Sequence, residues 1–311
     1  FSWLIHLWDS ENPSVIGVGE CSIIKTLSPD WHEDYESDLK HLIQSQELLS
    51  NMNHSWFNDR PSIKFGLETA LLDLKNGGKQ ILFESDFTSG KKGIKINGLI
   101  WMGDKSFMLE QIQGKLNHGF DCIKLKIGAI DFDSELELLD FIRSKFSKST
   151  IEIRVDANGA FPPKEASDKL KQLSSFDIHS IEQPIRQGQL KEMNRLCIEN
   201  NLDIALDEEL IGVKKESRDD LLDAIKPQYI ILKPSLIGGF EECNDWIERC
   251  DKRNIKWWIT SALESNVGLN AIAQWTFVLG NVLPQGLGTG QLYVNNIKSP
   301  LQIEEGFLYH R

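Results

Sequence analysis

Five charged residues recur along this chain at intervals that would allow them to share one site. Asp156 follows Lys126 by 30 residues, and Glu182, Asp207 and Lys233 follow at further steps of 26, 25 and 26 residues. Each of these charges ends a short apolar run. Carboxylates bind hard divalent cations and lysines exchange protons, so the set predicts metal-assisted proton transfer.

The three acids predict the metal site itself. If Asp156, Glu182 and Asp207 end neighbouring strands, their mutual repulsion would be prohibitive without a cation. Three oxygen ligands without histidine or cysteine favour Mg²⁺, completed by water and substrate oxygens, with Mn²⁺ as the expected substitute. The alternative is three separate, solvated acids, each of them common at a strand end.

Lys126 and Lys233 are the candidate acid and base. A lysine is a useful base only if its pKa falls toward neutrality, which burial and positive neighbours can produce. Lys124, two residues before Lys126 on the same strand face, would be one such neighbour and the metal another. Two lysines facing each other across the site suit removal of a proton α to a carboxylate.

The intervals between the charges match a strand followed by a crossover helix. In 123–127 apolar and charged residues alternate, which places both lysines on one strand face, although an exposed antiparallel strand would alternate similarly. Eight such strand–helix units over 94–295, with the eighth strand at 282–287, predict an α/β fold, a (β/α)8 TIM-type barrel with its site at the C-terminal strand ends. An open doubly wound sheet is the rival, but no G-x-G-x-x-G follows the early strands.

The first part of the chain predicts a separate N-terminal domain. Residues 1–93 contain two expected strands, 1–9 and 15–20, followed by helices, which is typical of a small α+β unit. The segment 296–311 is expected to complete this domain by pairing back onto it.

Composition narrows the possible partners. The formal net charge of −12 argues against nucleic acid or an anionic membrane surface, but allows a small anionic carboxylate substrate. Five scattered cysteines without C-x-x-C are typical of buried thiols in a reducing cytoplasm. No apolar run reaches the ~18 residues of a membrane span, and no signal peptide is visible, although residues are expected to precede Phe1. The oligomeric state is left open.

Five short motifs resemble the enolase superfamily, in its muconate-lactonising subgroup, and the resemblance covers essentially the whole chain. They are Lys124-Leu125-Lys126, Asp156-Ala157-Asn158-Gly159, Glu182-Gln183-Pro184, Asp207-Glu208 and Lys233-Pro234. The resemblance implies that the three acids hold Mg²⁺, that Lys126 and Lys233 act as acid and base through an enediolate, and that the N-terminal domain caps the barrel. It also implies that the loop 19–27 closes over substrate. Expected substrate-binding or supporting residues are Lys124, Asn158, Glu208, Ser261, Glu264, Gly288 and Thr289.

Reactions within this subgroup include cycloisomerisation, dipeptide epimerisation, N-acylamino acid racemisation and a dehydration that forms 2-succinylbenzoate for menaquinone biosynthesis. The stretch 261–265 and the glycine-rich turn 286–290 resemble the dehydrating branch. Backbone N–H groups of this turn could hold a carboxylate, although a plain connecting turn would look the same. A dipeptide epimerase would place Asp-x-Asp here, and this sequence does not. Racemisation, a Schiff-base aldolase using Lys233 and a non-catalytic barrel remain the rivals.

Overall fold

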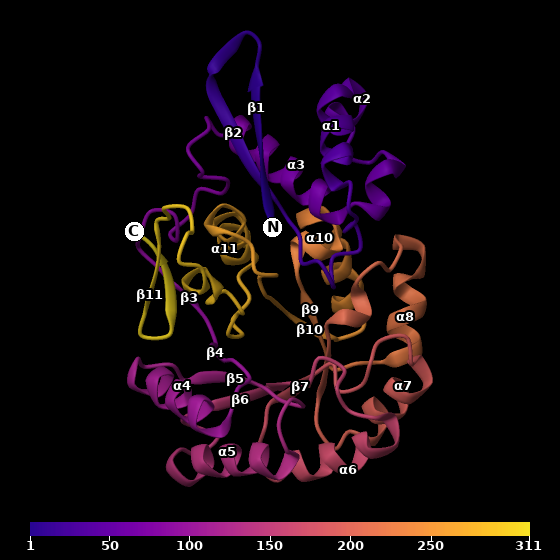
Figure 1. The fold of residues 1–311 in the computed structure, drawn as a ribbon, viewed down its shortest axis with the longest axis vertical. Coiled ribbons are helices and arrows are strands. Elements are labelled where there is room, and N and C mark those ends of the chain that lie inside the picture. Colours follow the sequence, from indigo (N-terminus) through magenta and orange to yellow (C-terminus); the bar gives the residue numbers. More distant parts are fainter.

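A curled sheet of seven parallel strands forms the centre of the molecule (Figure 1). The computed structural model describes the backbone of residues 1–311 and every side chain except that of Gln291. Each strand pairs with the next along the chain, which confirms the predicted alternation of strands and helices. The strands are β4 (Gly98–Ile100), β5 (Cys122–Lys126), β6 (Glu152–Asp156), β7 (Ser180–Glu182), β8 (Ile204–Leu206), β9 (Tyr229–Leu232) and β10 (Lys256–Ile259).

The two edges of this sheet are joined by a short segment where an eighth strand was expected, at 282–287. Gln285 forms an isolated parallel bridge with Ile96, and Gly286 forms another with Thr260. The side-chain oxygen of Gln285 also accepts a hydrogen bond of 2.7 Å from the backbone N–H of Ile259. The segment is shorter than predicted because Pro284 has no N–H to donate to a strand ladder. The closed ring is consistent with a TIM-type barrel.

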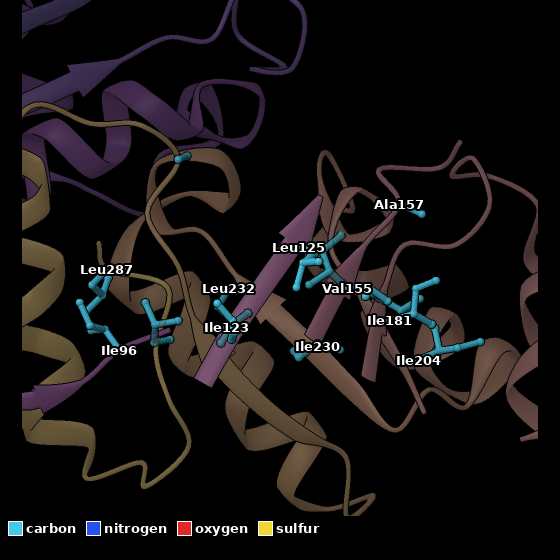
Figure 2. Packing of buried hydrophobic residues seen from close by; sticks show 14 of the residues in the cluster. Ile96, Ile123, Leu125, Val155, Ala157, Ile181, Ile204, Ile230, Leu232 and Leu287 are labelled. Atoms are coloured by element: carbon cyan, nitrogen blue, oxygen red, sulfur yellow. The ribbon is translucent and has the colours of Figure 1, made fainter. Parts of the chain in front are cut away.

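Alternation along the strands gives the sheet two chemically different faces. Apolar residues such as Ile123, Leu125, Val155 and Ile181 are fully or almost fully buried in the main core (Figure 2). Apolar side chains of the surrounding helices belong to the same core. Burial of each such side chain contributes about 1.5–3 kcal/mol.

The helices are α4 (Lys105–Asn117), α5 (Phe132–Lys145), α6 (Pro163–Ser174), α7 (Leu190–Glu199), α8 (Arg218–Ile225), α9 (Pro234–Ile237), α10 (Gly239–Asp251) and α11 (Asn266–Leu279), with short 3-10 turns η2 (Glu208–Leu210), η3 (Lys215–Ser217) and η4 (Thr289–Leu292).

The other face of the sheet carries a fully buried arginine near the start of the strands. The guanidinium of Arg154 in β6 stacks 4.2 Å from the Trp258 ring and donates a 2.9 Å hydrogen bond to the Pro284 carbonyl. It therefore ties β6 to the segment that closes the ring. Large side chains fill this end, and the five predicted site charges lie at the opposite, C-terminal ends of the strands.

Residues 2–75 form a hairpin and helices at one end of the molecule, opposite α5 and α6 (Figure 1). Here β1 (Ser2–Asp9) pairs with β2 (Asn12–Ser22), followed by α1 (Tyr35–Gln44), α2 (Gln46–Ser50), η1 (Ser55–Asp59) and α3 (Pro61–Lys75). Helix α3 contacts β2 on one side and α9 and α10 on the other. Residues 19–22 of the expected lid loop 19–27 belong to β2, because their register with β1 continues to Ser22.

The C-terminal residues form a hairpin of β11 (Leu301–Glu304) and β12 (Phe307–His310). Strand β12 pairs with β3 (Ile94–Lys95) and not with β1 or β2, while Arg311 donates a 3.1 Å hydrogen bond to the Gly90 carbonyl within the predicted N-terminal domain. Ile96, the residue directly after β3, forms the bridge to Gln285, so the C-terminal hairpin beside β3 lies next to the point where the ring closes. Within the described residues, no helix has the length and apolar character needed to cross a membrane. All five cysteines are buried and free of disulfides.

Replacing Gly19 with alanine is expected to destabilise the protein by more than about 2 kcal/mol. A Cβ at this position would lie 1.9 Å from the Gly66 carbonyl oxygen, so β2 and α3 would have to separate. Gly114→Ala in α4 is the matched control, because its Cβ would meet nothing within 4 Å and should stabilise by about 0.5–1 kcal/mol. The urea concentration at the midpoint of unfolding measures the stability of both variants. An unchanged midpoint for Gly19→Ala would contradict the close packing of β2 on α3.

Candidate active site

Strand register places the first three predicted charges side by side. Lys126 pairs with Asp156 across β5 and β6, and Asp156 pairs with Glu182 across β6 and β7. Side chains at paired positions of neighbouring strands point to the same face. Asp207 and Lys233 directly follow β8 and β9, so both enter the site from the C-terminal ends of their strands.

The three acids lie close enough to share a cation. One carboxylate oxygen from each of Asp156, Glu182 and Asp207 lies within 4.8 Å of the others, and the side chains are 0–2% exposed. Among the described residues, Oε1 of Glu182 is buried without a hydrogen-bond partner. Burial, followed by the negative charges of Asp156 and Asp207, raises the pKa of Glu182 to about 8, although Lys124 opposes the shift. An all-oxygen set with an unpartnered buried oxygen fits a hard divalent ion.

Two lysines compensate part of this negative charge. Nζ of Lys124 lies 2.8 Å from Glu182 and 3.2 Å from Asp156, and Nζ of Lys126 lies 2.7 Å from both Asp156 and the Asn158 amide oxygen. Burial alone would raise the pKa of Asp156, but the two ammonium groups outweigh it and hold that pKa well below its usual range. Asp156 is therefore an anion that links both lysines of β5 to the acid cluster.

Lys233 occupies the other side of the acid cluster, where it forms an ion pair with Asp207. Burial would lower the pKa of Lys233, but Asp207 and Glu208 together raise it. The pKa of Lys124 is likewise raised, because Glu182 and Asp156 outweigh burial. Burial therefore does not bring Lys233 toward neutrality, because its nearest charges are carboxylates. The geometry keeps Lys233 a cation.

Glu208 adds a fourth carboxylate to this cluster. Its Oε1 accepts a 2.9 Å hydrogen bond from the Asn158 amide, and burial together with Asp207 raises its pKa to about 7. When all four acids are ionised they outnumber the three lysines by one negative charge. A bound divalent cation would reverse that sign, and the site would then attract an anionic substrate.

The structure shows a role for Gln183 that the sequence reasoning missed. The fully buried side-chain oxygen of Gln183 accepts from the backbone N–H of Asp207 at 3.2 Å and of Glu209 at 3.3 Å. Its nitrogen donates to the Glu209 carboxylate at 3.0 Å. Gln183 thereby sets the position of Asp207 relative to Glu182. The motif Glu182-Gln183-Pro184 contained this residue, but only the pairing of β7 with β8 shows what it contacts.

The remaining predicted residues lie in two loops that meet beside the ring closure. The Ser261 and Thr289 hydroxyls are hydrogen-bonded to each other, and Gly288 and Thr289 help to line a cavity of about 450 Å³. Glu264 is fully buried and accepts from the Ser235 hydroxyl at 2.5 Å and the Ala262 N–H at 2.7 Å. Burial raises the pKa of Glu264 to about 7. Within the described residues, none of these four forms a hydrogen bond with the acid cluster.

Known proteins are similar in sequence to this chain over most of its length. The family described as enolase C-terminal domain-like matches residues 108–310. The o-succinylbenzoate synthase of Desulfotalea psychrophila is 61% identical over 94% of this chain and 88% of that protein. The o-succinylbenzoate synthase of Bacillus subtilis is 26% identical over 79% of this chain and 64% of that protein.

Solved structures share the fold as well. The crystal structure of MenC from Desulfotalea psychrophila matches with a TM-score of 0.91 and 48% identity, over 99% of this chain and 94% of that one. The L-Ala-D/L-Glu epimerase from Bacillus subtilis matches with a TM-score of 0.83 over 100% of this chain and 88% of that one, but its identity of 18% shows only a common fold. From sequence and structure together, the chain belongs to the enolase C-terminal domain-like family, within the enolase superfamily.

Proposed function

We propose that this chain catalyses the o-succinylbenzoate synthase reaction, the dehydration of 2-succinyl-6-hydroxy-2,4-cyclohexadiene-1-carboxylate to 2-succinylbenzoate in menaquinone biosynthesis. The observation that carries the proposal is the 61% identity, over 94% of the chain, to a protein of that name. The arrangement of two lysines on opposite sides of an acid cluster supports it, because the reaction begins by removing a proton α to a carboxylate. The proposed architecture is a complete (β/α)8 barrel capped by residues 1–93.

Lys126 is the proposed base and Lys233 the proposed electrostatic partner. Lys126 in its neutral form takes the proton from the carbon that bears the carboxylate. The same lysine then returns this proton to the departing hydroxyl, so that water leaves, the ring becomes aromatic and the lysine is neutral again. Lys233, whose pKa is raised because Asp207 and Glu208 outweigh burial, stays an ammonium and stabilises the flat enediolate.

Asp156, Glu182 and Asp207 are the residues proposed to hold Mg²⁺, or Mn²⁺ in its place. The unpartnered Oε1 of Glu182 and the mutual approach of the three acids support this assignment. When bound, the ion would neutralise the second negative charge that the substrate carboxylate gains as the proton leaves. Asn158 and Lys124 hold Asp156 and Glu182 in place through their hydrogen bonds. The scattered free cysteines fit the proposed location, a reducing cytoplasm.

Turnover of the cyclohexadiene substrate is expected to depend on added Mg²⁺. Loss of the diene absorbance should be observed with Mg²⁺, should stop after EDTA treatment and should return when Mg²⁺ is restored. An N-succinyl amino acid in deuterated water is the comparison substrate, and exchange of its α-hydrogen without any dehydration would favour a racemase instead. If EDTA-treated protein dehydrated the substrate at the full rate, the metal site would be contradicted. If the protein did not dehydrate the substrate in the presence of Mg²⁺, the proposed reaction would be contradicted.

A further inference from the structure

A buried carboxylate of the N-terminal hairpin contacts the start of a barrel helix. Glu20 in β2 is 0% exposed. Its carboxylate accepts from the backbone N–H of Ser265 at 2.7 Å, from the Ser265 hydroxyl at 2.5 Å and from the Gly268 N–H at 2.7 Å. These donors belong to the N-terminus of α11, whose first N–H groups have no partner within the helix. Ser2 donates a fourth hydrogen bond at 2.7 Å.

The contact leaves no spare room around this carboxylate. A Cβ on Gly268 would lie 3.0 Å from Glu20 Oε2 and 2.8 Å from the Glu264 Cβ. Glu20 and Glu264 therefore flank the same backbone position. A negative side chain at a helix N-terminus is favourable because the free N–H groups carry partial positive charge. Glu20 supplies the negative charge at the N-terminus of α11, although it lies 245 residues before Ser265 in the sequence.

The loop held by Glu20 leads directly to Lys233. Ser265 follows Glu264, and the Glu264 carboxylate accepts a hydrogen bond from Ser235, two residues after Lys233. Leu263, in the same loop, has a positive φ of 65°, a conformation that costs a non-glycine residue free energy and persists only when its surroundings hold it. A continuous chain of contacts thus runs from β2 through Ser265 and Glu264 to the backbone that carries Lys233.

A second carboxylate offers an internal comparison. Glu68 in α3 accepts from the backbone N–H groups of Phe240 at 2.5 Å and Glu241 at 3.0 Å, at the start of α10. It joins the N-terminal residues to a barrel helix in the same manner as Glu20. No hydrogen bond links Phe240 or Glu241 to a site residue in the described part of the chain. Glu68 therefore docks the two parts of the molecule without a connection to the loop 261–265.

We propose that Glu20 is a positioning residue for the reaction, which sets the loop 261–265 and through it the backbone around Lys233. Glu20 does not contact the substrate in this proposal. It makes the active site depend on docking of the N-terminal hairpin, so that the barrel loops reach their productive geometry only when β2 is in place. The expected effect on kcat rests on the proposed function. The expected effect on the order of the loop 261–265 does not.

Glu20→Gln is the main test, with Glu68→Gln as the matched control. The introduced side-chain amide would point an N–H donor at the N–H donors of α11, so the loop should lose order. Hydrogen exchange of the peptide 261–270 is expected to accelerate in Glu20→Gln and to stay unchanged in Glu68→Gln. Both variants should lower Tm by about 2–4 °C, since each loses one helix cap. Only Glu20→Gln should lower kcat by about tenfold or more, with a smaller change in KM.

Ser265→Ala is the second variant, in case Glu20→Gln does not fold. It removes one bond to Glu20 and the cap bond that the Ser265 hydroxyl accepts from the Val267 N–H, and it should accelerate exchange of the same peptide with a smaller loss of kcat. The inference is overturned if kcat of Glu20→Gln stays within about twofold of wild type, whatever the exchange rate of the peptide. If Glu20→Gln does not fold, Ser265→Ala decides by the same criterion. The inference is also overturned if Glu68→Gln lowers kcat equally. Inactive wild-type protein would overturn the proposed function instead, while the exchange measurement would still test the contact.

Discussion

Replacement of Lys126 by alanine is expected to lower turnover of the cyclohexadiene substrate by about a thousandfold or more, the upper range for loss of a general base. Nζ of Lys126 lies 2.7 Å from Asp156 and from Asn158, so it is held at the edge of the acid cluster. The side chain is 14% exposed, so it is not fully covered by protein. Absorbance assays at saturating Mg²⁺ measure the effect, and circular dichroism checks that the fold is retained.

Lys126→Arg separates the charge of this residue from its role as a base. Arginine keeps a cation beside Asp156, but its pKa above 12 prevents it from taking a proton at neutral pH. We therefore expect the arginine variant to be as inactive as the alanine variant while it binds substrate more tightly. Lys148→Ala, at an exposed lysine paired with Asp177, is the neutral control. Activity of Lys126→Arg above about a tenth of wild type, a barrier change under ~1.4 kcal/mol, would exclude the proposed role.

Asp207→Asn is expected to remove both Mg²⁺ binding and turnover. The substitution takes one anionic ligand from the acid cluster and leaves the Lys233 ammonium without its ion-pair partner. A neutral amide is a weaker ligand for a hard cation than a carboxylate. Titration calorimetry with Mg²⁺ alone should show no saturable binding, and the absorbance assay should show turnover reduced by about a hundredfold or more.

Asp203→Asn is the matched control for this experiment. Asp203 immediately precedes β8, at the strand end opposite Asp207, so the same chemical change is made at the two ends of one strand. Mg²⁺ affinity and turnover should stay at the wild-type level in Asp203→Asn. If Asp207→Asn bound Mg²⁺ as tightly as the control, the three acids could not be the metal ligands.

Much of the curled parallel sheet and its helices could be predicted because these elements are local in sequence. Period-two alternation in 123–127 and apolar runs that end in charge are properties of single strands, and they were sufficient to locate β5 to β9. The repeat length then ordered these strands in a parallel sheet. Since consecutive strands of such a sheet are neighbours, the acids that end them had to approach one another.

Features that depend on distant residues were missed or predicted wrongly. The ring closes through isolated backbone bridges of Gln285 to Ile96 and of Gly286 to Thr260, a shorter segment than the predicted eighth strand. The C-terminal hairpin pairs with β3, which lies more than 200 residues earlier in the chain, so no local pattern indicates this partner. Glu20 and Gln183 have partners that only the packing of separate elements reveals.

By itself, the sequence determined which five charges this protein brings together and on which strands they lie. Spacing and alternation are enough for that, because a parallel strand–helix repeat leaves each strand end at the same side of the sheet. Only the tertiary structure decided how those charges are paired, with Lys126 bonded to Asp156 and Asn158 and Lys233 to Asp207. The physical reason is that pairing, and the pKa that results from it, depends on register and on distances of a few ångströms between residues far apart in the chain.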